Sequence, residues 1–206
     1  MLLICFDTCL DKMYVTLKKD DKILSSEVVE NTDTKYHSAF LISTLQNIMS
    51  KNGIKPQNLE LIAVNIGPGS FTGIRACTTV ARVIAQQLNI KATVISSLEI
   101  LAKLNKTDKK TLVALDARKN SAYLLIDGEI KGAVALEKVQ DIIKNGNYFV
   151  ITDNKLKPIL GGISYQGNNY PLGEILAELA EKKSQTEECN WRKLKPLYIQ
   201  PPPMGA

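Results

Sequence analysis

The chain has 206 residues, of which 45% are hydrophobic and 23% charged, and its net charge is +5. This balance excludes intrinsic disorder, which goes with few apolar residues, and lacks the dense basic stripe of a dedicated nucleic-acid-binding domain. No apolar stretch approaches the roughly 20 residues of a membrane helix, and the start lacks the charged segment of a signal peptide. The four cysteines have no CxxC spacing and are typical of reduced thiols in the cytoplasm: Cys5, Cys9, Cys77 and Cys189.

The first hundred residues predict three strands, then a helix, a strand and a helix. The apolar run from Leu2 to Phe6 suits a strand that is buried on both faces. Alternating residues around Val15 and a turn at 20–21 predict an antiparallel meander. We expect the later elements to be a helix of about five turns over 34–52, a strand over 61–66, a helix over 74–88, a strand at 94–95 and a helix ending near 104.

The opening pattern returns in the second half of the chain. A shift of 109 positions aligns the strand that ends at Asp7 with an apolar run that ends at Asp116, and Tyr14 with Tyr123. Such an internal repeat predicts a duplicated βββαβα lobe. The second copy is shortened, with a helix at 136–143, a strand at 148–152 and a helix at 172–183. The polar, lysine-rich stretch near 105–110 predicts the boundary, giving lobes 1–105 and 106–206.

A glycine-rich turn joins the fourth strand to the next helix. Its glycines match neither the Walker spacing nor the dinucleotide fingerprint. Two interpretations stay open: backbone amides that bind an anion or nucleotide, or a tight turn that packs the helix close to the sheet. Arg75 in the following helix is an anion ligand or the partner of a local carboxylate. The candidate residues are Gly67, Gly69, Ser70, Thr72, Gly73 and Arg75.

Carboxylates end the first strand of each lobe. In a two-lobed ATPase, Asp7, with Thr8, and Asp116 would hold Mg²⁺ through water at the strand ends, and the alternative is that each aspartate caps a turn. His37 is the only histidine, and no cysteine pair is evident from the spacing. We therefore expect neither a metal site nor a catalytic residue.

The two long helices are apolar around more of their circumference than one core-facing stripe requires. The excess indicates either docking of a partner chain or packing of the two helices against each other. The candidate partner-binding residues are His37, Phe40, Leu41, Thr44, Leu45, Ile48, Ala76, Cys77, Val80, Val83 and Ile84.

The segment 65–75, with sequence NIGPGSFTGIR, resembles the GPGSFTGxR signature of the bacterial TsaB family, also called YeaZ. Further family-like pieces occur in the same order along the chain, and the likeness is strong over the first 125 residues. They are Phe6-Asp7-Thr8, His37-Ser38, Ser96-Ser97-Leu98, Leu115-Asp116-Ala117-Arg118 and Pro196-Leu197-Tyr198-Ile199.

The resemblance implies a two-lobed actin/Hsp70/sugar-kinase-like (ASKHA) α/β fold and a non-catalytic scaffold for TsaD, the homologue that carries the catalytic site. It further implies a TsaE-type ATPase as a third component, tRNA reached through the complex, threonylcarbamoyladenosine at position 37 of ANN-decoding tRNAs as product, and a homodimer when the chain is alone. No cofactor of its own is expected, with ATP or ADP at the partner interface left open. The alternative function is an autonomous ATP-binding kinase of small molecules or a glycoprotease-like peptidase.

The sequence departs from the family pattern at three positions. Cys77 and Val83 stand where the family usually has glycines, which changes how closely the helices can approach a partner, and Gln200 replaces an arginine. Two basic clusters raise a separate hypothesis of direct tRNA binding, against the alternative of solvated surface. They comprise Lys103, Lys106, Lys109 and Lys110, and Lys182, Lys183, Arg192, Lys193 and Lys195.

Overall fold

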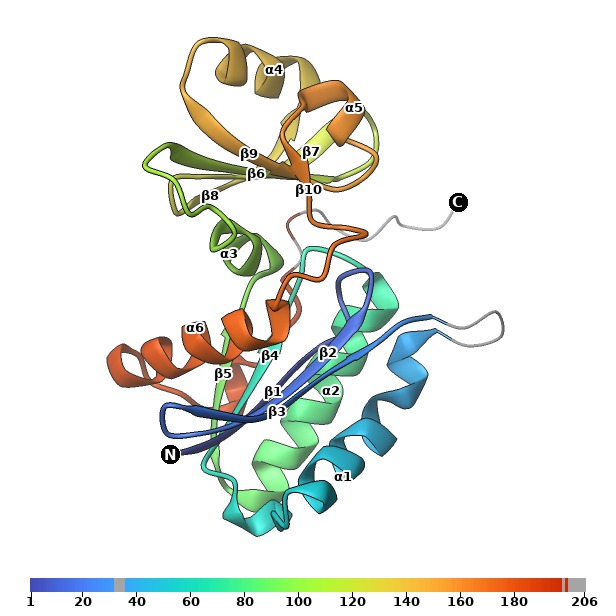
Figure 1. The fold of residues 1–206 in the computed structure, drawn as a ribbon, viewed down its shortest axis with the longest axis vertical. Coiled ribbons are helices and arrows are strands. Elements are labelled where there is room, and N and C mark those ends of the chain that lie inside the picture. The colour runs from blue at the N-terminus through green and yellow to red at the C-terminus, as the bar shows by residue number, and fades with distance from the viewer. Residues whose placement is uncertain (32–35, 198, 200–206) are drawn as a thin grey trace. The chain divides into compact units, whose positions relative to one another are not determined.

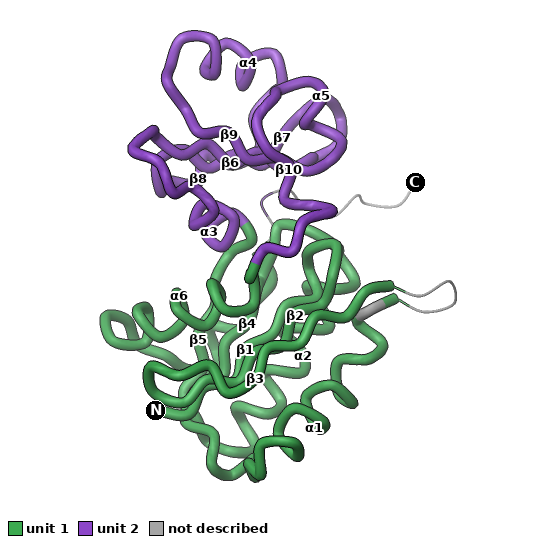
Figure 2. The backbone as a smooth tube through the Cα atoms, in the orientation of Figure 1, with its two compact units in different colours: residues 1–97, 171–197 green, residues 98–170, 198–206 purple. Residues whose placement is uncertain are grey.

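The computed structural model describes residues 1–31, 36–197 and 199, and the chain divides into two compact units. Unit 1 comprises residues 1–97 and 171–197, and unit 2 comprises 98–170 and 198–206 (Figure 2). The predicted division at 105 assigned the whole second half to one lobe. The structure instead returns helix α6 (Leu172–Thr186) to unit 1, because its apolar side covers a sheet face that would otherwise be bare.

Unit 1 is built on a five-stranded sheet with the order β3-β2-β1-β4-β5. The three N-terminal strands form the predicted antiparallel meander, and β4 and β5 are added in parallel to β1. Every residue of β1 and β4 is buried, as their continuous apolar sequences predict. The strands are β1 (Leu2–Asp7), β2 (Met13–Lys19), β3 (Lys22–Val29), β4 (Leu61–Asn65) and β5 (Lys91–Ile95).

Helices cover both faces of this sheet (Figure 1). On one face lie α1 (Leu41–Lys51) and α2 (Phe71–Leu88), and on the other lies α6. The predicted first helix is shorter than expected because a 3₁₀ turn, η1 (His37–Phe40), precedes α1. Short turns η2 (Pro56–Asn58) and η3 (Trp191–Lys193) complete the unit. Within the described ranges, no helix combines the length and apolarity needed to cross a membrane.

The alternation along β1 separates two packing layers. Leu2, Ile4 and Phe6 belong to the core under α1 and α2, whereas Cys5 points to the opposite face, where its thiol lies 3.5 Å from the carbonyl oxygen of Gly173 in α6. A Cβ on Gly173 would lie closer than 3.0 Å to the Thr16 hydroxyl. The helix can therefore approach the sheet this closely only with glycine at that position.

Unit 2 repeats the strand order of unit 1, β8-β7-β6-β9-β10. Its connections follow the same sequence of strands and helices, which confirms the duplicated α/β architecture and the two-lobed fold class. The copy is shortened at its end, where α5 has four residues and β10 has two. The elements are α3 (Ser97–Ala102), β6 (Lys110–Asp116), β7 (Ser121–Ile126), β8 (Glu129–Ala135), α4 (Leu136–Lys144), β9 (Tyr148–Thr152), α5 (Lys157–Leu160) and β10 (Ile163–Ser164).

One part of the predicted repeat is wrong. Asp7 lies opposite Tyr14 in the first hairpin, but Asp116 lies opposite Ala122, and Tyr123 lies opposite Leu115. The hairpin connection in unit 2 is one residue shorter, and a one-residue change of register moves a side chain to the other face of a sheet. The two tyrosines are therefore not equivalent, although the strands that end at Asp7 and Asp116 are.

Candidate functional site

The end of β1 is closed to solvent. Asp7 is 1% exposed and Thr8 is fully buried. The Asp7 Oδ1 atom accepts a hydrogen bond of 2.5 Å from the Cys9 amide, and the Oδ2 atom is buried without a hydrogen-bond partner in the described part of the chain. Burial raises the pKa of Asp7, and the Asn65 side chain and the Cys9 amide oppose this shift only in part. A carboxylate in this position is not placed to reach a solvated nucleotide.

Two cysteines meet beside this carboxyl group. The sulfur of Cys77, which belongs to α2, lies 3.1 Å from the amide nitrogen of Thr8 and 3.1 Å from the Thr8 hydroxyl oxygen. The Cys9 thiol donates to the carbonyl oxygen of Asn65 over 3.2 Å. One potential ligand atom from each of Asp7, Cys9 and Cys77 lies within 4.8 Å of the others. The spacing of the cysteines along the chain hid this cluster from the sequence analysis, because only the fold brings α2 against the end of β1.

The glycine turn packs directly on the same segment. The Ser70 amide donates to the Cys9 carbonyl over 2.7 Å, and the Gly67 amide to the Asn65 side chain over 2.8 Å. A Cβ at Gly73 would lie closer than 3.0 Å to the carbonyl oxygen of Thr8. A Cβ at Gly69 would lie closer than 3.0 Å to the carbonyl oxygen of Cys9. These contacts favour the packing interpretation of the turn over anion binding, since the space beside it is filled by protein backbone.

The start of α2 uses the remaining residues of the motif locally. The Ser70 hydroxyl accepts from the Gly73 amide over 3.2 Å, which caps the helix and lets it begin at Phe71, three residues earlier than predicted. The Arg75 guanidinium lies 3.9 Å from the centre of the Phe71 ring, which is a cation–π contact. Thr72 is exposed.

The predicted partner-binding residues divide into two groups. Five of them face the protein's own core and are at most 6% exposed: Leu41, Thr44, Leu45, Ile48 and Cys77. Their spacing forms the stripe with which α1 and α2 pack on the sheet, so the structure places them internally. Phe40, Ala76, Val80 and Ile84 are partly exposed, and Val83 is 53% exposed. The side chain of His37, like residue Gln200, lies outside the described residues.

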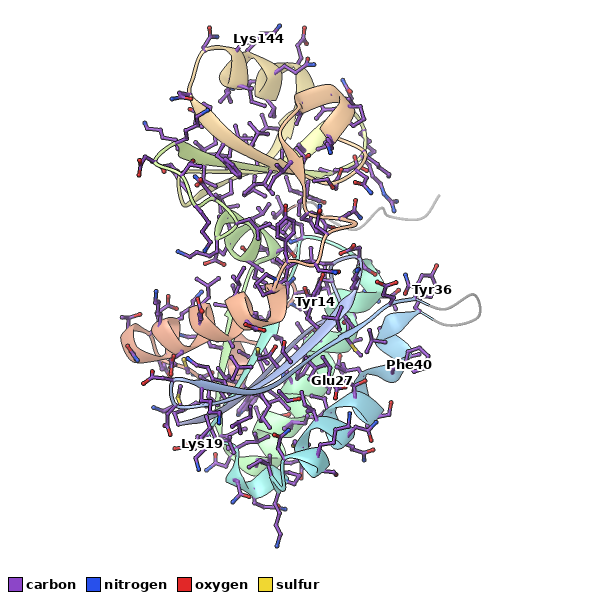
Figure 3. The ribbon with its side chains drawn as sticks, viewed as in Figure 1. Tyr14, Lys19, Glu27, Tyr36, Phe40 and Lys144 are labelled. Carbon is purple, nitrogen blue, oxygen red and sulfur yellow. The ribbon has the colours of Figure 1, made fainter. Side chains whose placement is uncertain are left out.

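The structure adds one residue to the exposed group. Ile42 is 51% exposed, and it directly follows the buried Leu41, so the helical turn carries it away from the core stripe. Figure 3 shows Tyr36 and Phe40 at the N-terminal end of the same helix. We define the helix face as Phe40 and Ile42 of the first helical segment with Ala76, Val80, Val83 and Ile84 of α2.

The matching strand end in unit 2 is open. Asp116 has 23% of its side chain exposed and pairs with Lys155 over 2.9 Å, and its other oxygen accepts from the Arg118 amide over 3.0 Å. Burial alone would raise the pKa of Asp116, but the Lys155 and Arg118 hydrogen bonds outweigh it and lower that pKa. This aspartate caps a turn, as one of the two sequence interpretations proposed.

The two basic clusters lie on the surface. All four lysines between 103 and 110 are exposed, as are Lys182, Arg192, Lys193 and Lys195, while Lys183 is partly buried. The Trp191 ring contacts two guanidinium groups, Arg82 at 5.0 Å and Arg192 at 4.7 Å from its centre. Three of the cluster members therefore have structural partners: Arg192 in this stack, Lys183, which lies 4.0 Å from Glu187, and Lys193, which donates to the Glu188 carbonyl oxygen over 2.6 Å.

Comparison with known proteins identifies relatives. Residues 22–150 match the family model described as TsaD, tRNA N6-adenosine threonylcarbamoyltransferase. The tRNA threonylcarbamoyladenosine biosynthesis protein TsaB of Bacillus subtilis is 29% identical over 124 residues, or 60% of this chain and 53% of the relative. The TsaB of Buchnera aphidicola subsp. Baizongia pistaciae is 24% identical over 222 residues, which cover 96% of this chain and 97% of the relative. The chain thus spans about half of the first relative and nearly all of the second.

Solved structures share the fold. An uncharacterized Pseudomonas aeruginosa protein with similarity to peptidase YEAZ superposes with a TM-score of 0.76 at 22% identity, covering 97% of this chain and 99% of that one. YeaZ from the same organism superposes with a TM-score of 0.74 at 22% identity, covering 96% of this chain and 99% of that one. Since the family model matches more than half of the chain and the curated relatives share one name, the chain belongs to the TsaB (YeaZ) family.

Proposed function

We propose that this chain is a non-catalytic accessory subunit in the biosynthesis of threonylcarbamoyladenosine in tRNA, and that it binds a TsaD-type catalytic homologue through the helix face. The names of the curated relatives support the pathway. The observation that carries the proposed role is the exposure of Ile42 and Val83, about half of each side chain, on the two helices that cover one side of the unit 1 sheet.

The composition of these helices supports a protein contact rather than solvent. Charged residues make up 23% of the chain, yet α1 carries only Lys51 and α2 only Arg75 and Arg82. Depletion of charge at the centre of a patch is the compositional mark of an interface. Helix α6 on the opposite face of the sheet differs, because its 15 residues include Glu174, Glu178, Glu181, Lys182 and Lys183.

The closed strand end supports the non-catalytic part of the proposal. A sugar-kinase-like site needs its strand-end carboxylate in contact with a metal-bound nucleotide, but Asp7 is 1% exposed and the glycine turn rests on Thr8 and Cys9. The kinase alternative predicts that the isolated chain binds MgATP. Titration calorimetry that detects such binding would favour the alternative.

Further parts of the proposal concern the assembly. We propose that a TsaE-type ATPase joins the pair, that tRNA is bound through the complex, and that the same helix face forms a homodimer when the chain is alone. A nucleotide at the junction of the subunits is compatible with a chain that needs no cofactor of its own. The free thiols fit a reducing compartment such as the cytoplasm.

Reconstitution tests the function directly. A TsaD-type homologue from the same cell, a TsaE-type ATPase, unmodified tRNA and the threonylcarbamoyl donor are incubated with and without this chain, and the modified nucleoside is measured by mass spectrometry. We expect modification only when the chain is present. Equal modification in its absence would contradict an accessory role, and modification by the chain without the homologue would show that it is itself the enzyme.

A further inference from the structure

The cluster at the end of β1 contains groups that the proposed function does not use. Asp7, Cys9 and Cys77 are each no more than 2% exposed, and they come from a strand, its following turn and a distant helix. The Asp7 Oδ2 atom has no hydrogen bond of normal length among the described residues, although the Asn65 side chain and the Leu10 amide lie beside the carboxyl group. A buried acceptor left unpaired destabilises a fold, and a cation bound in the cluster would give this oxygen a partner.

The donor set and its spacing fit a soft divalent cation. In a tetrahedral zinc site, Zn–S bonds of about 2.3 Å place two sulfurs about 3.8 Å apart, and a carboxylate oxygen somewhat nearer. The three ligand atoms here lie within 4.8 Å of one another, so small side-chain rotations bring them to this separation. Two thiolates with one carboxylate favour zinc over magnesium or calcium, which prefer oxygen ligands alone.

We propose that Asp7, Cys9 and Cys77 form a buried structural zinc site. Two oxygen atoms are at hand for the fourth position: the Thr8 hydroxyl, 3.1 Å from the Cys77 sulfur, and the Asn65 carbonyl, 3.2 Å from the Cys9 sulfur. On binding, each thiol releases its proton to solvent and the carboxyl group binds as carboxylate, so no oxidation or reduction is involved. The positive charge of the cation would stabilise the ionised thiols and the carboxylate in this buried site.

The site would fasten the end of β1 to α2. Cys77 is the only one of the three ligands that comes from α2, whose outer side carries Val80 and Val83 of the helix face. Zinc would therefore hold one helix of this face against the sheet. This inference is independent of the proposed function, because the cluster lies in the core of unit 1 whatever partner the chain binds.

Metal analysis of the full-length chain tests the proposal. The protein is purified from cells grown with added zinc, without chelators, and zinc is measured by mass spectrometry after gel filtration. A second sample is unfolded, stripped of metal, and refolded with Co²⁺, whose thiolate complexes absorb in the near ultraviolet. We expect one metal ion per chain, the thiolate absorption with cobalt, and a higher melting temperature with zinc than in EDTA.

Three variants locate the metal. Cys77→Ser and Asp7→Asn should lose stoichiometric zinc, whereas Cys189→Ser, the same change at a partly exposed cysteine outside the cluster, should keep it. Asp7→Asn removes a charge without changing the volume, so it stays informative if Cys77→Ser does not fold, and circular dichroism checks both. A wild-type chain without zinc overturns the proposal. So does zinc that persists in Asp7→Asn or is lost in Cys189→Ser.

Discussion

The two sheets have the same strand order, but the ends of their first strands differ. Asp7 in unit 1 is covered by the glycine turn and by α2, whereas Asp116 in unit 2 is partly exposed and paired with Lys155. Unit 2 has a four-residue helix, α5, where unit 1 has the 18 residues of α2. The duplicated topology thus places a carboxyl group at the same point twice, and the element packed next to it decides whether that group is buried or paired at the surface.

The largest expected effect comes from opening the closed end. Gly73→Ala puts a methyl group closer than 3.0 Å to the Thr8 carbonyl, so either the turn or β1 must move. We expect a loss of about 3 kcal/mol or more in the free energy of unfolding, measured in urea. Gly53→Ala is the control, because the added Cβ meets no atom within 4 Å. Only the positive φ of 64° would be strained in this variant, and we expect it to lose about 1 kcal/mol of unfolding free energy. Equal losses in the two variants would show that the turn is not tightly packed.

The next effect compares two ion pairs. Lys18 of unit 1 pairs with Glu181, with side chains 8% and 21% exposed, whereas Lys155 of unit 2 is 76% exposed. Lys18→Ala leaves a largely buried glutamate without its partner, and we expect a loss of about 2 kcal/mol. Lys155→Ala should cost at most about 0.5 kcal/mol. Chemical unfolding of both variants gives the two losses of unfolding free energy. If Lys155→Ala loses as much as Lys18→Ala, the effect does not follow the difference in burial.

The pH dependence of stability should differ in sign between the two aspartates. The raised pKa of Asp7 means that its contribution to stability is fully present below the unfolded-state pKa, near 3.8, and is lost as pH rises through the folded-state pKa. The lowered pKa of Asp116 gives the opposite: its contribution is present above that value and is lost as pH falls through the folded-state pKa.

Unfolding free energies of Asp7→Asn and Asp116→Asn, measured in EDTA across acidic to neutral pH, test these signs. Relative to wild type, the stability of Asp7→Asn should increase as pH rises, because the variant has no buried carboxyl group that must ionise. Asp116→Asn should become less favourable over the same interval, by a small amount because the group is partly exposed. Parallel pH profiles for the two variants would contradict the distinction between the strand ends.

Much of the fold could be predicted from the sequence, because its signals are local. The fully apolar runs predicted β1 and β4, and the repeat of a strand ending in aspartate predicted the second sheet. The return of α6 to unit 1 could not be predicted, since its apolar stripe fits either sheet. Nor could the register of the second hairpin, because one residue fewer in a turn leaves the alternating pattern intact and reverses the faces.

The candidate site was predicted less completely. The apolar width of the two helices indicated a docking surface, but it did not separate Leu41, in the core, from Ile42, at the surface. That assignment depends on how the helix is rotated against the sheet, which tertiary packing determines. The meeting of Cys9 with Cys77 is likewise a product of the fold, and no spacing rule for cysteines covers residues so far apart in the chain.

The central claim is that the helix face binds a catalytic homologue, and one binding measurement tests it most directly. Val83→Glu places a charge in the helix face, at a side chain that is 53% exposed. Ile159→Glu, the control, places the same charge in unit 2 at a side chain that is 47% exposed. Light scattering after gel filtration with the purified TsaD-type protein should show a heterodimer for wild type and Ile159→Glu, and separate proteins for Val83→Glu. A heterodimer that survives Val83→Glu unchanged, or that is lost in Ile159→Glu, would contradict the account.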